Sequence, residues 1–287
     1  MRKVLAIVLA LAVLCLAGCG SNTAVDLSEA KSLADLGGAK IAAQSGTFHA
    51  DALEQIEDAT TSTYPDFTDL LVALQSGAID GYVAEEPTAL SVCGQEENLS
   101  YVPLVNNDTG FTATAADVGI AIGLKSGSPL REQINAVLAD ITVDTQKALM
   151  EQIVDICAGK EVEEFVLKSE APANPTGTLK VAMECAYEPY NWTETGAKTL
   201  GAVAISGEGK DGLYANGYDV QIAQYVANKL GLKLEIYAIE WDSLIPAVQS
   251  GNVDAIVAGM SPTAEREEEI DFTNTYYESN LVIIIKK

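Results

Sequence analysis

The sequence predicts an α/β fold made of two similar lobes, and two observations lead to this prediction. Apolar strands alternate with amphipathic helices along the chain, a rhythm typical of sheets covered by helices. In addition, the segment LVALQSGAIDGYVA at 71–84 is matched by IPAVQSGNVDAIVA at 245–258. One supersecondary unit used twice at this distance indicates two related lobes, because a repeat array would show a period of about 20 to 50 residues.

The spacing of apolar residues places the main elements, and glycines mark where several helices end. Gly77 and Gly251 each follow a helical pattern and precede a strand, so we interpret both QSG copies as helix stops. Ser128 is expected to cap a helix that starts at Pro129. We expect strands at 39–44, 79–84, 119–125, 179–184 and 232–239, and helices at 48–56, 66–74, 128–141, 217–231 and 242–251.

Two segments lie outside this rhythm. Residues 1–18 combine a basic start with an apolar run too short for a membrane span, which is typical of an export signal. The tetrad LAGC resembles a bacterial lipobox, so Cys19 is the expected lipidation site and 19–31 a polar tether; an ordinary secretory signal is the alternative. Residues 158–178 are charged and contain two prolines, which predicts a linker with one short element in EFVL.

Composition narrows the function classes. The formal net charge of −24 argues against nucleic-acid binding, because phosphates require a basic surface. His49 is the only histidine, and neither a Ser/His/Asp constellation nor a Gly-rich phosphate loop is present. Cys93, Cys157 and Cys185 show no metal-ligand spacing; they allow at most one disulfide, whose pairing stays open. We expect neither a metal nor a cofactor.

One long segment carries a family resemblance. EWDSLIPAVQSGNVDAIVAGMSPTAEREEEIDFTNTYYESNLVIII at 240–285 resembles the bacterial extracellular solute-binding proteins, family 3, which serve polar amino-acid ABC importers. LKVAMECAYEPYNW at 179–192 resembles the first strand and pocket loop of that family, and AKIAAQSGTFH and IDGYVAEEPTA resemble the ligand-facing parts of its second lobe. The resemblance implies the type II periplasmic-binding-protein fold, in which two α/β lobes, each a mixed sheet flanked by helices, are joined by a hinge.

The order of the segments differs from the family's usual order. The family places the LKVAM half first, whereas here the AKIAAQSG lobe comes first, so the resemblance implies a circular permutation, which neighbouring termini make tolerable. We expect one covalent crossover near 119–125, with LVIIIKK completing the other hinge strand only by pairing. The expected division is 32–118 for the second, smaller lobe, 119–157 plus 179–287 for the first, larger lobe, and 158–178 for the linker between the family's usual ends.

The resemblance also implies a ligand site for an amino acid, whose carboxylate and ammonium must both be paired when water leaves the cleft. Arg266 offers a guanidinium that can hold a carboxylate bidentately, although an exposed arginine paired with neighbouring glutamates is the bland alternative. Thr47 and Phe48 begin a helix whose free N–H groups favour anions, and Thr47 also suits a helix cap. The expected carboxylate contacts are Arg266, Ser261, Thr47 and Phe48.

Acidic and aromatic residues are expected around the rest of the ligand. Glu85 matches the family position that receives the ammonium, with Gly259 and Ser261 completing that shell and Glu86 as the alternative in a shifted register. Aromatic rings suit an alkyl stem or a guanidinium plane. For the ligand side chain we expect Glu184, Tyr187 and Trp241, with Tyr190 and Asp219 as further contacts.

The sequence therefore predicts a monomeric, lipid-anchored, extracytoplasmic protein that binds a basic or large polar amino acid, closes about a hinge and delivers its ligand to an ABC importer permease. Two alternatives remain: a ligand sensor of the same fold, and a cyclohexadienyl-dehydratase-like enzyme in which a carboxylate acts as the acid. Free amino acid, permease and membrane lipid on Cys19 are the expected partners.

Overall fold

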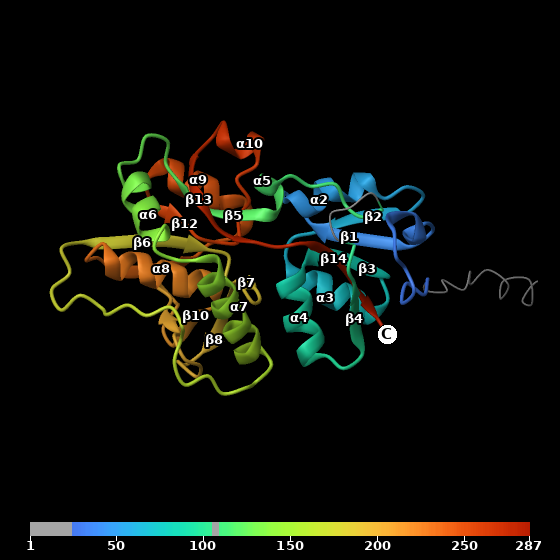
Figure 1. Cartoon of the computed structure of the whole chain (residues 1–287), viewed down its shortest axis with the longest axis horizontal. Coiled ribbons are helices and arrows are strands. Elements are labelled where there is room, and N and C mark those ends of the chain that lie inside the picture. The colour runs from blue at the N-terminus through green and yellow to red at the C-terminus, as the bar shows by residue number, and fades with distance from the viewer. Residues whose placement is uncertain (1–24, 105–108) are drawn as a thin grey trace, which may run out of the picture.

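The computed structural model describes residues 25–104 and 109–287 and has two α/β lobes side by side (Figure 1). Each lobe contains a five-stranded mixed sheet flanked by helices, which confirms the expected two-lobed architecture of the type II periplasmic-binding-protein fold. We call the lobe that contains β1 the small lobe and the lobe that contains β6 the large lobe. The signal segment 1–18 and the proposed lipidation site Cys19 lie outside the described residues.

The small lobe is formed by the N-terminal part of the described chain together with one strand, β14, from the C-terminal end. Its elements are η1 (Leu33–Leu36), β1 (Lys40–Gln44), α2 (Phe48–Ala52), η2 (Leu53–Gln55), β2 (Thr60–Tyr64), α3 (Phe67–Ser76), β3 (Gly81–Glu85), α4 (Glu86–Gln95), β4 (Leu99–Val102), α5 (Ala115–Val118) and β14 (Leu281–Lys286).

The large lobe is an uninterrupted stretch between the two crossings of the chain. Its main elements are β5 (Gly119–Leu124), α6 (Leu130–Leu138), α7 (Val143–Cys157), β6 (Thr178–Met183), α8 (Tyr218–Lys229), β11 (Lys233–Ala238), η3 (Trp241–Ser243), α9 (Leu244–Ser250), β12 (Ala255–Ile256), α10 (Ala264–Glu267) and β13 (Asp271–Glu278). A second, four-stranded sheet is formed by β7 (Ala186–Tyr187), β8 (Asn191–Thr195), β9 (Val203–Ala204) and β10 (Leu213–Asn216).

The two main sheets have the same strand order. The small-lobe sheet runs β2-β1-β3-β14-β4 and the large-lobe sheet β11-β6-β12-β5-β13. In each sheet three parallel strands are followed by one strand that arrives from a crossing and pairs antiparallel, β14 with β3 and β5 with β12. The carboxyl ends of the parallel strands of both lobes therefore face the space between them, where open α/β sheets place their ligands.

The chain crosses between the lobes twice, and both crossings are covalent (Figure 1). One joins α5 to β5, and the other runs from β13 through Ser279 and Asn280 into β14. The expectation of a single covalent crossover is therefore wrong, as is the assignment of the end of 179–287 to the large lobe. The physical reason is that the apolar run at 281–285 is buried between β3 and β4 of the small lobe.

The two crossings lie next to each other. The backbone N–H of Ser279 donates a hydrogen bond to the carbonyl of Val118 at 3.3 Å. A hinge made of two adjacent strands allows the lobes to rotate about one line, which is the geometry of hinge closure around a ligand.

The tether and linker predictions hold only in part. Leu27 is buried with Leu36 in the apolar core of the small lobe, so the described end of the expected tether 19–31 packs against the lobe. In the linker, residues 159–177 contain neither a helix nor a strand, so the element expected in EFVL is absent. Phe165 and Leu167 nevertheless pack against the large core, which shows how single apolar side chains can anchor an irregular backbone.

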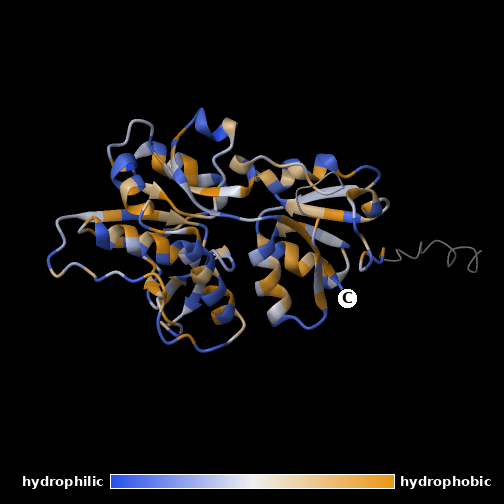
Figure 2. Cartoon of the chain, in the orientation of Figure 1, coloured by the Kyte–Doolittle hydropathy of each residue, from blue (hydrophilic) through white to orange (hydrophobic). Residues whose placement is uncertain are grey.

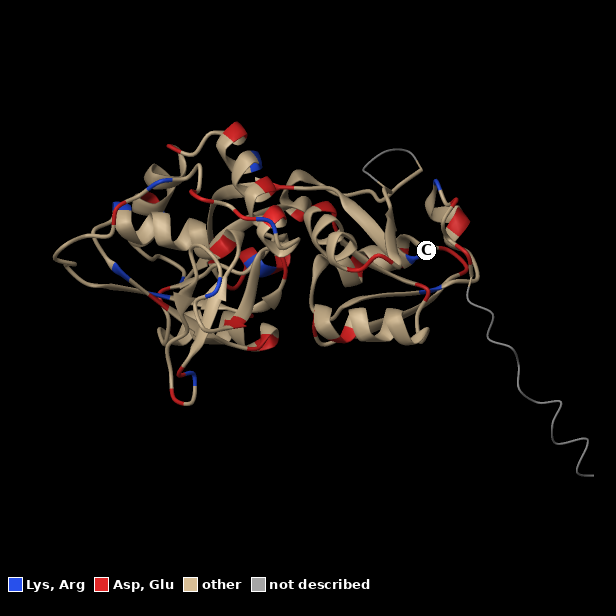
Figure 3. Ribbon diagram, turned by 90° about the horizontal axis from the view of Figure 1, so that it is seen from below, with Lys and Arg blue, Asp and Glu red and all other residues tan. Residues whose placement is uncertain are grey.

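Most expected elements are present at or near their predicted positions. Both helix stops are confirmed: α3 ends at Gly77 with φ 78°, and α9 ends at Gly251 with φ 76°, both in the left-handed region. Helix α6 begins at Leu130, one residue after the expected Pro129. Apolar residues occur in the strands and helices of both lobes (Figure 2), and acidic residues are spread over both lobes (Figure 3).

Two further findings concern export and cysteine chemistry. Among the residues that the structure describes, no helix has both the length and the apolar character needed to cross a membrane. Cys93, Cys157 and Cys185 are all free thiols. Burial raises the pKa of Cys157 and of Cys185 to about 12, which keeps these two thiols protonated at neutral pH.

Candidate functional site

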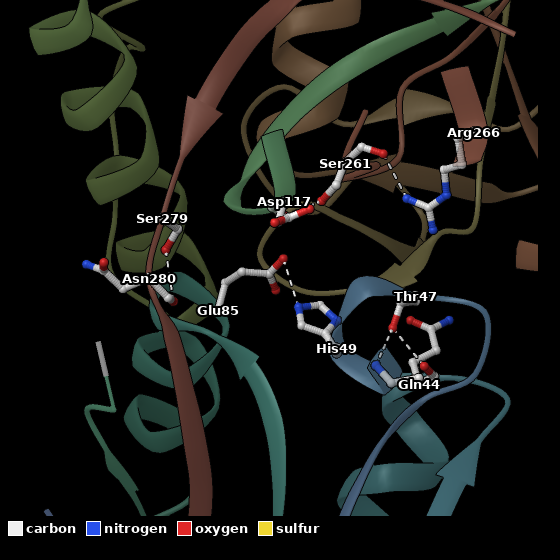
Figure 4. Close-up of polar contacts among 10 residues, drawn as sticks. Gln44, Thr47, His49, Glu85, Asp117, Ser261, Arg266, Ser279 and Asn280 are labelled. Carbon is white, nitrogen blue, oxygen red and sulfur yellow. Dashed lines mark hydrogen bonds and ion pairs between the residues drawn. The ribbon is translucent and has the colours of Figure 1, made fainter. Parts of the chain in front are cut away.

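A small cavity lies between the lobes, at the carboxyl ends of the parallel strands. Its free space is only about 10 Å³, roughly what one water molecule needs and far below the range of about 300–1,000 Å³ usual for ligand pockets, so a larger ligand can enter only when the lobes move apart. Both lobes contribute side chains, so the cavity exists only while the lobes are together (Figure 4). The lining residues are Gln44, Thr47, Phe48, His49, Phe67 and Glu85 from the small lobe, and Tyr187, Trp241, Gly259, Ser261 and Arg266 from the large lobe.

Arg266 provides the permanent positive charge of this cavity. It lies on the short helix α10, whose N-cap Thr263 accepts a hydrogen bond from the Arg266 N–H. Its Nη1 donates to the carbonyl of Ser261 at 2.9 Å, and its Nη2 donates to the carbonyl of Gly46 across the lobes at 2.9 Å. The guanidinium carbon lies 5.3 Å from the centre of the Trp241 ring. Burial lowers the pKa of Arg266 below its usual value, yet the group stays charged at neutral pH.

Thr47 stands at the start of α2, opposite Arg266. Its hydroxyl donates to the carbonyl of Gln44 at 2.7 Å and accepts the N–H of Ala50, so the capping function expected for this residue is confirmed. Phe48 is the first residue of the helix and lines the cavity. The helix therefore starts toward Arg266, and both lobes present donors to the same region.

Glu85 provides the negative charge on the other side of the cavity. It is the last residue of β3, is buried, and lies 3.1 Å from Nε2 of His49 (Figure 4). Its second carboxylate oxygen is buried and has no hydrogen-bond partner among the described residues. Glu86, the alternative in the shifted register, starts α4 and lines a different hollow near the hinge. The structure thus brings Glu85, and not Glu86, to the cavity.

Gly259 and Ser261 form the large-lobe wall between these two charges. Gly259 has φ +61°, and a Cβ there would lie 3.1 Å from the Tyr187 ring, so both conformation and space favour glycine. The Ser261 hydroxyl donates to the carbonyl of Asp117, next to the crossing, at 2.7 Å. Ser261 therefore connects the cavity wall to the hinge.

Two of the expected side-chain contacts, Tyr190 and Asp219, do not line the cavity. Both are completely buried. Asp219 accepts hydrogen bonds from Tyr276 Oη at 2.6 Å, from Asn191 Nδ2 at 2.8 Å and from the Gly259 backbone. Burial raises the pKa of Asp219 to about 7 despite these donors. Both support residues that line the cavity. Asp219 accepts a hydrogen bond from the Gly259 backbone, and the ring of Tyr190 packs against that of Tyr187 with ring centres 4.8 Å apart.

Of the other residues expected around a ligand side chain, Tyr187 and Trp241 line the cavity and Glu184 does not. Tyr187 stacks on Phe67 of the other lobe with ring centres 4.1 Å apart, and its hydroxyl is buried without a protein partner. Trp241 donates its Nε1–H to the Gly46 carbonyl at 3.1 Å. Glu184 does not line the cavity itself but accepts a hydrogen bond of 2.7 Å from Gln44, which does. Desolvation raises the pKa of Glu184 to about 7.

Three lining residues were not predicted as ligand contacts, namely Gln44, His49 and Phe67. Gln44 ends β1 and His49 lies in the first turn of α2, so both flank the predicted Thr47. A chain segment that leaves a strand and starts a helix brings several consecutive side chains to the same edge of the sheet. Phe67 carried no local signal, because its position depends on contact with Tyr187 of the other lobe.

The arrangement suits a small zwitterion. A guanidinium and a helix start face one end of the cavity, a carboxylate faces the other, and aromatic rings line the walls between them. Within the described parts of the chain, no cluster of His, Cys, Asp and Glu side chains could hold a metal ion. The site can therefore pair the two charges of an amino acid and cover its apolar stem.

Comparison with known proteins gives a family match for the C-terminal part of the chain. Residues 206–287 match the family model described as "Bacterial extracellular solute-binding proteins, family 3". An arginine-binding extracellular protein of Bacillus subtilis is 40% identical over 80 residues, which cover 28% of this chain and 31% of the relative. A probable histidine-binding protein of Campylobacter jejuni is 34% identical over 115 residues, covering 40% of this chain and 38% of the relative.

A third relative extends the range of ligands. The L-cystine-binding protein of Bacillus subtilis is 32% identical over 111 residues, which cover 39% of this chain and 35% of the relative. The chain thus aligns with about a third of the length of these curated relatives. All three relatives are named as amino-acid-binding proteins.

Proposed function

We propose that this chain is a bacterial extracellular solute-binding protein of family 3, which binds a free amino acid between its lobes and delivers it to an ABC importer. The observation that carries the proposal is the cavity in which Arg266 and Glu85 stand on opposite sides, one from each lobe. An amino acid held by both groups would tie the lobes together, so binding and closure become one event.

The ligand carboxylate is proposed to bind Arg266, with Ser261, Thr47 and Phe48 as further contacts. Arg266 reaches both lobes through its hydrogen bonds to Ser261 and Gly46, so a carboxylate placed there bridges them. The ligand ammonium is proposed to bind Glu85, whose buried second oxygen offers an acceptor, together with the Gly259 carbonyl and Ser261. Pairing both charges offsets the cost of removing them from water.

The side chain of the ligand is proposed to be basic or large and polar. Tyr187 and Trp241 provide aromatic faces, and Glu184 provides a carboxyl group that contacts the cavity through Gln44. The relatives named for arginine and histidine support a basic ligand, while the cystine-binding relative supports a large polar one.

The proposed location is outside the cytoplasm, where the exported protein is anchored through lipid on Cys19 and acts as a monomer. The lobes are proposed to be circularly permuted relative to the family's usual order, with 158–178 joining the usual ends. The family match at 206–287 follows β1, β2, β3 and β4 of the small lobe in the chain, which supports this order.

Calorimetric titration of the purified protein against the twenty amino acids tests the proposal. We expect one ligand per chain and the tightest binding for arginine, lysine or another large polar amino acid. Binding of none of the twenty would contradict the proposed function. Tightest binding of an aliphatic or acidic amino acid would leave amino-acid binding intact and refute the assignment of the side-chain contacts.

A further inference from the structure

His49 occupies a place that the ligand ammonium also needs. Its Nε2 lies 3.1 Å from Oε1 of Glu85, and both residues are more than nine-tenths buried. The ring meets Phe67 edge to face at 5.8 Å between ring centres and lines the cavity with Glu85. The buried Nδ1 of His49 has no hydrogen-bond partner in the part of the chain that the structure describes. A group that accepts a proton therefore touches the carboxylate to which the proposed function assigns the ligand's cation.

The two protonation states of His49 have opposite consequences for an ammonium at Glu85. A neutral imidazole with its proton on Nε2 donates to one carboxylate oxygen and leaves the net charge of Glu85 available. An imidazolium neutralises Glu85 and repels a second cation in a site with little water. Occupation of Glu85 by an ammonium and protonation of His49 therefore oppose each other.

Other ionisable groups surround this pair and shape the same response. Arg266 and Tyr187 share the cavity with His49, and Asp51 lies on the same helix. Glu184 is linked to the cavity through its hydrogen bond with Gln44. The charge of Glu85 contributes to raising the pKa of Tyr190 and of Asp219. Burial raises the pKa of Glu184 and of Asp219 to about 7, so the experiment must separate the effects of these two carboxyl groups from that of His49.

We propose that His49 is a ligand-site residue that competes with the ligand ammonium for Glu85, so that acidification releases the bound amino acid. The proposal rests on the amino-acid-binding function and goes beyond it, because it assigns a proton-linked step to one side chain. By linkage, ligand binding expels the proton of His49 to the same extent that protonation weakens ligand binding. For one proton, affinity changes by at most about tenfold per pH unit.

The first test measures arginine affinity by calorimetry between about pH 8 and pH 5.5. For the wild type we expect affinity to fall on acidification, with proton release detected in buffers of different ionisation enthalpy. His49→Gln keeps an N–H donor without the titration, so its affinity should change less with pH. Repeating both measurements in a Glu184→Gln background removes the contribution of that carboxyl group. Equal pH dependence with and without His49→Gln overturns the proposal.

The second test needs no variant of the histidine and uses arginine as the ligand. Because the sequence contains one histidine, one set of imidazole signals reports its protonation by NMR. Glu85→Gln should move the titration midpoint of these signals to lower pH, and saturating arginine should do the same in the wild type. An unchanged midpoint in both experiments overturns the proposal. Absence of amino-acid binding to the wild type at every pH refutes instead the proposed function.

Discussion

The two lobes share one framework and differ in the segments attached to it. In each lobe a helix ends at the glycine of a QSG triplet, and an aspartate three residues later binds the first parallel strand. Asp80 exchanges hydrogen bonds with Lys40, its carboxylate accepting the Lys40 N–H at 2.8 Å, and Asp254 does the same with Lys180 at 2.9 Å. The shared parts form the scaffold.

The difference begins at the carboxyl ends of β3 and β12. The small lobe continues directly into a helix and presents one carboxylate, Glu85. The large lobe turns at Gly259 and carries an irregular segment to Arg266. The same framework, used twice, thus supplies opposite charges from opposite sides. The comparison teaches that scaffold and ligand chemistry can be separated by mutation.

The largest effect on affinity is expected from Arg266, which lies in the segment that differs between the two lobes. Arg266→Ala should weaken amino-acid binding by about 3 kcal/mol, roughly 100-fold, because a carboxylate would stay unpaired in a closed cavity. Calorimetry measures the affinity, and Arg131→Ala, which removes a side chain that is about half exposed, provides the matched control. Wild-type affinity in Arg266→Ala would refute the assigned division between scaffold and ligand site.

The shared aspartates should affect stability in both lobes. Asp80→Ala leaves the Lys40 N–H without its acceptor and should lower the free energy of unfolding by about 2 kcal/mol. Asp254→Ala should cost less, about 1 kcal/mol, because Asp254 is less buried than Asp80. Urea unfolding provides the measurement, with the exposed Asp211→Ala as control. A loss for only one of the pair would break the proposed equivalence.

The two helix-ending glycines should respond alike. Ala at position 77 or 251 would meet no atom closer than 4.0 Å, so the cost is the left-handed conformation alone. We expect Gly77→Ala and Gly251→Ala each to destabilise the protein by about 1 kcal/mol, a fall in Tm of about 2–4 °C. Asn, which tolerates this conformation, should cost less at both sites. Thermal unfolding that separated the two alanine variants strongly would show that the caps are not equivalent.

The smallest effect concerns ligand selection by pH. The pKa of Glu184 is raised to about 7, so this carboxyl group is neutral below that pH and charged above it. The affinity ratio of arginine to citrulline, which lacks the positive charge, should therefore rise as pH increases through about 7, by roughly tenfold or less. Competition calorimetry provides the ratio, and Glu184→Gln should make it independent of pH. If the ratio of arginine to citrulline affinity did not change with pH in the wild type, the proposed contribution of Glu184 to ligand selection would be refuted.

Local patterns predicted much of the fold. Helix ends at Gly77 and Gly251 and the strands around them can be inferred from short-range spacing and turn chemistry, and the structure has them there. The path of residues 281–286 could not be inferred in this way, since an apolar run fits an interior strand of either lobe equally well. Which sheet accepts it depends on contacts with β3 and β4, far away in the sequence.

The cavity residues that belong to sequence motifs could be predicted. A residue whose position depends on contacts between the lobes could not. Arg266, Ser261, Gly259, Thr47, Phe48 and Glu85 all reach the cavity, as do Tyr187 and Trp241. Tyr190 and Asp219 were predicted as ligand contacts but do not line the cavity. The sequence does not distinguish a residue that lines a cavity from a residue that supports it. Phe67 needs Tyr187 as its partner, and no pattern within one lobe reveals that pair.

The position of β14 has a consequence for how the molecule is made. Residues 119–280 form the large lobe without interruption, and their two ends meet at the hydrogen bond between Ser279 and Val118. The small lobe is therefore begun first during synthesis but cannot join β4 to β3 until the whole of this insert has been made. During this interval β3 and β4 lack the strand that pairs with both of them. Because unpaired strand edges promote aggregation, we expect the nascent chain to depend most on chaperones while the large lobe is being made.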